Sequence, residues 1–170
     1  MEKILTIIDK MNQFIGDIVS LLIIPIFLIM LYEVFIRYVL NSPGVWSTEL
    51  AQLLFGAYAV LSAGIILQWG GHVNVDIFYG RFSKRGKAVL DICTSFLFFI
   101  FSITLVYTSY KFAFHSIKIV EHMETTWNPP IYPFKTMIAI AAVLLLLQGI
   151  AKLIRDIEIV FSAKKNKGLD

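Results

Sequence analysis

The sequence predicts an all-α integral membrane protein with four transmembrane helices and an N-terminal amphipathic interfacial helix. Of its 170 residues, 58% are hydrophobic and 16% are charged, whereas globular domains average about 45–50% and about 25%. The charges are also segregated, because residues 18–32, 50–75, 92–110 and 136–151 contain no Asp, Glu, Lys or Arg. This composition excludes a disordered chain and a soluble enzyme fold.

The four uncharged runs predict a single membrane domain over residues 1–170, with spans at about 18–40, 48–72, 88–112 and 134–156. A spanning helix needs about 20 apolar residues, and the shorter runs reach this length when flanking long side chains snorkel. Because backbone polar groups in hydrocarbon must be satisfied internally, each run must be a helix or part of a closed barrel. The runs lack polar alternation, which excludes the barrel.

The segment before the first span, residues 1–16, is predicted to be the amphipathic helix. Its apolar residues recur at spacings of three and four, and they are Ile4, Leu5, Ile7, Ile8, Met11, Phe14 and Ile15. Asp9 and Asp17 precede the apolar run and no small-x-small cleavage site follows it, which argues against a signal peptide. We expect a helix in the cytoplasmic interface, with Gly16 near the bend. A cytoplasmic extension of the first span is the alternative.

The distribution of Lys and Arg predicts the orientation in the membrane. Eleven of these residues lie before the first span, between the second and third spans, or after the fourth. Lys111, Lys118 and Lys135 lie on the opposite side. Positive residues are enriched in cytoplasmic segments, so both termini are predicted to be cytoplasmic. The net charge of +3 follows from this bias and requires no nucleic-acid partner.

Two charged residues lie within the first span, where ionisable groups are costly and suggest function. Glu33 and Arg37 are four residues apart and share a helix face. Glu49, across a short turn, is a second acid within reach of Arg37. We predict a structural ion pair that holds the first two spans together. The alternative is that Glu33 is a proton-coupling carboxylate, although a neighbouring arginine favours its charged form.

A second pair, His72 and Asp76, lies four residues apart where the second span leaves the membrane. This pair is predicted to close the cytoplasmic helix end or to bind a partner. His115 and His122 lie at or beyond the outer end of the third span, so His72 lacks the companion that haem ligation requires. We expect no metal, cofactor or catalytic residue in this chain. Cys93 is expected to be a small residue of the core or a residue that faces lipid.

Small residues on the second span predict close helix packing. Gly56 and Gly64 lie on one stripe of this helix, and Ala59 and Ala63 lie on an adjacent stripe. Small side chains allow the backbones of two membrane helices to approach closely. We therefore expect a neighbouring helix to contact this span at these positions.

The loop between the third and fourth spans carries charges of both signs on the predicted outer side. These residues are Lys111, Lys118, Glu121, Glu124 and Lys135. Such charges set encounter rate and register between proteins more than affinity. The loop, together with the turn at 42–48, is a possible docking surface for a soluble partner, and a merely solvated loop is the alternative.

Several short motifs follow one another in an order that resembles a known family. They are Glu33-Val34-Phe35-Ile36-Arg37-Tyr38, Trp46-Ser47-Thr48-Glu49-Leu50, Gly56-Ala57, Gly71-His72-Val73-Asn74-Val75-Asp76, Trp127-Asn128-Pro129-Pro130 and Gln148-Gly149-Ile150. Together they resemble the small membrane (Q, DctQ-type) subunit of tripartite ATP-independent periplasmic (TRAP) transporters over nearly the whole chain. The family commonly has a second acid beside Glu49, where this chain has Thr48.

The resemblance implies a non-catalytic anchoring subunit of a secondary importer in the bacterial cytoplasmic membrane. Its partners would be a large multi-span subunit, which would hold the substrate and coupling-sodium sites, and a periplasmic substrate-binding protein. The solute would be an organic acid of the sialic acid or C4-dicarboxylate class, with no substrate-binding residue in this chain. The alternative function is a self-sufficient, four-span, proton-coupled exporter that uses Glu33.

Overall fold

The structure, a computed structural model, describes residues 2–69 and 84–166, without the side chains of 84–85 and 162–166. Its helices are α1 (Glu2–Ser20), α2 (Ile23–Val39), α3 (Ser47–Leu61), α4 (Ala63–Gln68), α6 (Lys84–Lys118) and α7 (Tyr132–Asn166). Within the described ranges, four helical stretches are long and apolar enough to cross a membrane: Glu2–Val39, Ser47–Gln68, Gly86–Lys118 and Tyr132–Phe161. The predicted class of an all-α integral membrane protein is therefore confirmed.

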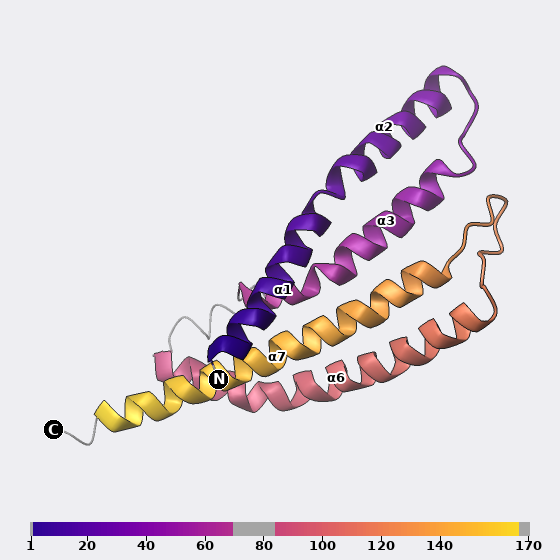
Figure 1. Cartoon of the computed structure of the whole chain (residues 1–170). Helices are drawn as coiled ribbons and strands as arrows, with labels where there is room; N and C mark the ends of the chain where they lie inside the picture. Colours follow the sequence, from indigo (N-terminus) through magenta and orange to yellow (C-terminus); the bar gives the residue numbers. More distant parts are fainter. Residues whose placement is uncertain (1, 70–83, 167–170) are drawn as a thin grey trace.

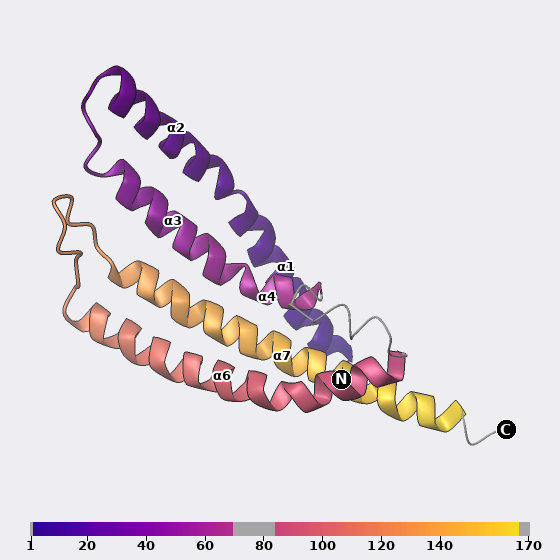
Figure 2. The same ribbon diagram turned by 180° about the vertical axis from the view of Figure 1, so that it is seen from behind.

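The helices form two antiparallel hairpins that diverge from a common base (Figure 1). One hairpin consists of α1 and α2 against α3 and α4, and the other consists of α6 against α7. Helix α7 is the central element, since it contacts α6, α4, α3 and α1. The turn at 40–46 and the loop at 119–131 lie at one end of the molecule, the loop end. The start of α1 and the end of α7 lie at the other, the terminal end (Figures 1 and 2).

The break between α1 and α2 is caused by Pro25. Proline has no N–H to donate to the carbonyl four residues earlier, and its ring clashes with that carbonyl. The carbonyl of Leu21 instead accepts a bond of 3.2 Å from the amide of Ile24. We expected the bend near Gly16, but the break lies after Ser20. Gly16 is a packing position, because a β-carbon there would overlap Ile65 of α4.

Helix α1 continues in nearly the same direction as α2 (Figures 1 and 2). The combined stretch has 38 residues, which corresponds to about 57 Å of helix, whereas the hydrocarbon core is about 30 Å thick. The buried residues of α1 are Leu5, Asn12, Gly16 and Val19. The apolar side chains of Ile4 and Phe14 are 65% and 66% exposed. Helix α1 therefore turns a partly polar side toward the protein, and its interfacial position stays a prediction.

The small residues of the second span fall into two groups. Gly64 is buried against Asn12 of α1, whose side chain occupies the space that a β-carbon would take. By contrast, Gly56 has no atom within 4 Å of that position. Ala59 is exposed and Ala63 is half-buried. The predicted close contact is therefore made within this chain at Gly64 but not at Gly56 or Ala59, because no described helix covers that side of α3.

Candidate functional site

The first polar cluster lies at the loop end, around Glu33. The Glu33 side chain is only 5% exposed, whereas many large apolar side chains of the chain are exposed. Its Oε1 atom accepts bonds from Arg37 Nη2 at 2.5 Å and Arg37 Nε at 3.0 Å. Its Oε2 atom accepts bonds from the Gly44 amide at 3.2 Å and from the Ser47 hydroxyl. One carboxylate thus joins α2, the turn and the first residue of α3.

This geometry favours a structural role for Glu33. Both carboxylate oxygens are occupied by donors, and the arginine satisfies the negative charge. Gly44 is needed for the backbone to approach the carboxylate, since a β-carbon at this position would overlap Ser47 Oγ and Glu33 Oε2. A proton-coupling acid would instead need access to solvent or substrate at one of its oxygens.

Glu49 is not a partner of Arg37 in this arrangement, which corrects the expectation of a shared site. Its Oε2 atom accepts a bond of 2.8 Å from the hydroxyl of Thr125. Glu49 follows Ser47 by two positions, which is about 200° of rotation around the helix. It therefore points away from Glu33 and ties α3 to the loop at 119–131.

The predicted docking residues occupy three different environments. Glu121 and Lys135 form an ion pair of 2.5 Å that joins the loop to α7, and Glu124 is exposed. Lys111 and Lys118 lie over aromatic rings of their own helix, at the loop end of α6. Of these five charges, Glu121 and Lys135 pair with each other, and a docking surface formed by all five stays a prediction.

We predict that the stability of the loop at 119–131 depends on pH because of the ion pair between Glu121 and Lys135. Lys135 holds the pKa of Glu121 below its usual range. Because the pKa of this carboxyl is lower in the folded state, its ionised form stabilises the fold. This stabilisation is complete above the pKa of the unfolded state, about 4.3, and is lost as the pH falls through the pKa of the folded state. Protection of the Ile131 amide, which donates to the Glu121 carbonyl, should persist from neutral pH to about 4.3 and decline below it.

Hydrogen exchange, corrected for the intrinsic rate at each pH, measures this protection. Glu121→Gln should weaken protection at neutral pH and remove its dependence on acid. Glu124→Gln removes the same charge from an exposed position in the same loop and should behave as the wild type. Equal protection in the wild type and in Glu121→Gln would contradict the prediction.

The second polar cluster lies toward the terminal end, and we did not predict it from the sequence. Gln148 of α7 is 1% exposed. Its Oε1 atom accepts a bond of 2.8 Å from Asn12 Nδ2, and its Nε2 atom donates to Asp9 Oδ1 at 2.9 Å. Asp9 also forms an ion pair with Arg155. These contacts fix the polar side of α1 on α7.

A further group of charges on α7 holds α6. Lys152 donates to Asp91 of α6 at 2.5 Å and to Asp156 at 3.1 Å. Gln148, Lys152 and Arg155 recur at spacings of four and three, which places them on neighbouring positions of one helix face. This spacing was the available signal in the sequence, but it does not reveal which helices lie opposite.

His72 and Asp76 lie outside the described residues, so their predicted pairing stays a prediction. Among the described residues, no group of three or more His, Cys, Asp or Glu side chains is arranged to hold a metal ion. Cys93 is free and exposed. An exposed position agrees with the lipid-facing alternative and not with a place in the core.

The fold and the two clusters define a multi-pass membrane protein whose long apolar helices are tied together by polar contacts at both ends. The chain belongs to the family described as "Tripartite ATP-independent periplasmic transporters, DctQ component", which matches residues 26–159. The suspected relationship to DctQ-type small subunits is therefore confirmed. This family is a transporter component and not a class of enzyme.

Two relatives show similarity over part of the chain. The "Sialic acid TRAP transporter small permease protein SiaQ" of Vibrio cholerae is 25% identical over 87 residues, or 49% of this chain and 50% of that protein. The "Sialic acid TRAP transporter permease protein SiaT" of Haemophilus influenzae is 28% identical over 93 residues, or 55% of this chain and 15% of that protein. The similarity thus spans about half of the Vibrio protein and a small part of the Haemophilus protein.

Proposed function

We propose that this chain is the small scaffold subunit of a TRAP-type importer and binds a larger permease subunit in the bacterial inner membrane. One observation carries the proposal. A segment similar to this chain makes up 15% of a longer permease protein in Haemophilus influenzae. A segment that is part of a larger permease in one protein is expected to associate with a separate permease in another. The occupied carboxylate of Glu33 further supports a scaffold over a proton-coupled exporter.

The exposed side of α3 is the surface that we propose for this association. Gln52, Gly56 and Ala59 recur at spacings of four and three, and all three are exposed. Small residues let membrane helices approach closely, and polar side chains in a span form hydrogen bonds with neighbouring helices. Lipid tails offer Gln52 no such partner, whereas a helix of the larger permease does.

Gly56→Leu should therefore block assembly and leave the isolated chain intact. The site has no neighbouring atom within 4 Å, so the new side chain meets nothing inside this protein. Overpacking a close interface costs about 1–3 kcal/mol, which corresponds to an association weaker by about fivefold to more than a hundredfold. Thermal unfolding of the isolated variant should match the wild type. Thr104→Leu on the exposed side of α6 is the control, and unchanged co-purification of Gly56→Leu would refute this interface.

We further propose that the complex takes up an organic acid, delivered by a periplasmic binding protein and driven by sodium bound to the larger subunit. Both relatives are named as sialic acid transporters, which supports sialic acid over a C4-dicarboxylate. The loop at 119–131, with Glu124 exposed, is the segment that we propose for contact with the binding protein.

Reconstitution tests this function directly. Sodium-dependent uptake should require this chain, the larger permease and the binding protein together, and this chain alone should transport nothing. Proton-driven transport by this chain alone, abolished in Glu33→Gln while the protein still folds, would establish the exporter instead.

The proposed orientation places the loop end in the periplasm and both termini in the cytoplasm. In a Cys93→Ala background, a cysteine at the exposed position Ser42 should react with an impermeant thiol reagent in intact cells. A cysteine at Lys3, which is exposed at the terminal end, should react only after the cells are permeabilised. The reverse pattern would overturn the orientation.

A further inference from the structure

Two lysines of α6 lie against aromatic rings and leave donors for an anion. Lys111 Nζ is 4.2 Å from the ring centroid of Tyr107, and Lys118 Nζ is 4.5 Å from that of Phe114. Neither lysine takes part in the ion pairs found among the described residues. A ring covers one side of an ammonium group, which has three N–H donors in all. Both lysines are thus held in place with donors still available.

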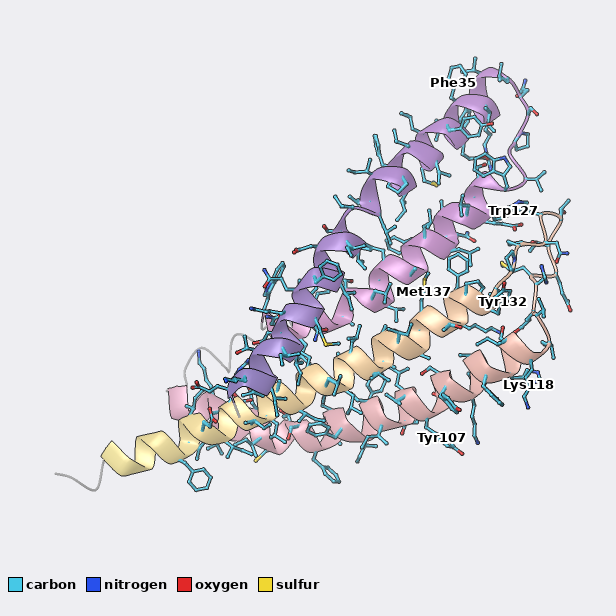
Figure 3. All side chains as sticks on the ribbon, viewed as in Figure 1. Phe35, Tyr107, Lys118, Trp127, Tyr132 and Met137 are labelled. Carbon is cyan, nitrogen blue, oxygen red and sulfur yellow. The ribbon has the colours of Figure 1, made fainter. Side chains whose placement is uncertain are left out.

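These lysines continue a stripe along the outer side of α6. Ile103, Tyr107, Lys111, Phe114 and Lys118 recur at spacings of four, four, three and four. Tyr107 and Lys118 point away from α7 (Figure 3). Ile103 is 57% exposed and Tyr107 is 59% exposed. A helix face that passes from apolar to tyrosine to lysine is typical of a helix leaving the hydrocarbon for the headgroup region.

An apolar groove begins beside this stripe. It lies between α6 and α7, has a volume of about 450 Å³, and is lined by Phe114 and Ile117 of α6. Along α7 it extends from Thr136 to Leu147, a rise of about 16 Å, and Met11 of α1 lines it as well. The ring of Phe114 therefore lines the groove and also supports Lys118.

The size of the groove distinguishes between its possible occupants. A helix is about 10–12 Å wide with its side chains, so 16 Å of helix occupies more than about 1,200 Å³. All the empty space of the groove, counted out to its open side, is about 880 Å³, which is less than the volume of such a helix. A single flexible hydrocarbon tail is narrow enough to lie within it. The lysines at the loop end are complementary in charge to a phosphate attached to such a tail.

We infer that α6 and α7 bind one phospholipid, with its phosphate at Lys118, attracted also by the charge of Lys111, and with one acyl tail in the groove. The phosphate accepts hydrogen bonds from the ammonium group of Lys118, which lies over Phe114. Lys111, which lies over Tyr107 about two helical turns away, attracts the phosphate through its charge. The tail covers exposed apolar side chains, among them Ile117 and Met11, which are 49% and 44% exposed. The lipid also holds the loop end of α6 at the level of the headgroups.

Native mass spectrometry of the full chain with added phosphatidylglycerol tests this site. The wild type should retain one lipid per chain. Lys111→Gln with Lys118→Gln should lower retention about 25-fold, since each lysine near an anionic lipid contributes on the order of a factor of five. Ala139→Phe, which fills the groove at a half-buried lining position, should lower retention while all charges remain. Lys10→Gln, at an exposed position of α1, removes the same charge elsewhere and should retain lipid as the wild type does.

Further results distinguish a bound lipid from free phosphate and a lipid site from a protein interface. Inorganic phosphate should not displace the lipid, because it has no tail for the groove, and displacement would show a simple anion site. Equal lipid retention in the wild type and the double lysine variant would overturn the inference. So would variants that keep the lipid but lose the co-purified permease, because the surface would then be a protein interface.

Discussion

Arg37→Ala should destabilise the protein more than the combined change Glu33→Gln and Arg37→Ala. Removal of the arginine leaves the carboxylate of Glu33, which is 5% exposed, without its counter-ion. Breaking a buried pair on one side costs about 3–5 kcal/mol, and the half-exposed position of Arg37 reduces this to about 2 kcal/mol. The neutral double variant keeps an amide oxygen for the Gly44 amide and the Ser47 hydroxyl and should recover much of the loss.

Thermal unfolding in detergent measures this difference. A loss of about 2 kcal/mol lowers the Tm by about 4–8 °C in a chain of this size. Ser42→Ala, in the exposed part of the same turn, is a control that should leave the Tm unchanged. If Arg37→Ala is no less stable than the neutral double variant, the pair does not hold the two spans together.

Gln148→Leu should release α1 from α7. Leucine has a similar size, so the main loss is the pair of hydrogen bonds to Asn12 and Asp9. A buried polar group left without its partner costs about 1–3 kcal/mol, and Asn12 is 3% exposed. The whole length of α1 should then exchange its amide hydrogens faster, while α6 stays protected.

Hydrogen exchange resolved by segment tests this result, with Gln13→Leu as the matched control. Gln13 lies one residue after Asn12 and is exposed, so the same chemical change there removes no contact with α7. Faster exchange in α6 as well would show that Gln148→Leu disturbs the core in general. Unchanged exchange in α1 would show that the apolar contacts of Leu5 and Val19 hold the helix without the polar cluster.

Local patterns in the sequence determined the helices and the Glu33 to Arg37 contact. Long uncharged runs form helices because hydrocarbon offers the backbone no other hydrogen-bond partner. Residues four apart on a helix meet whatever surrounds them, and so the structure brings Glu33 and Arg37 to 2.5 Å. The helix break after Ser20 also follows from a local cause, the missing N–H of Pro25.

Only the tertiary structure decided which of these helices meet. Sequence spacing gives the direction of a side chain on its own helix, but not the helix that lies opposite. Gln148 therefore finds Asn12, 136 positions away, and Glu49 bonds to Thr125 and not to Arg37. Gly56 and Gly64 belong to one stripe of small residues, yet only Gly64 contacts α1, through Asn12. Helix α1 packs against the second span at Gly64 and not at Gly56, which the sequence does not reveal.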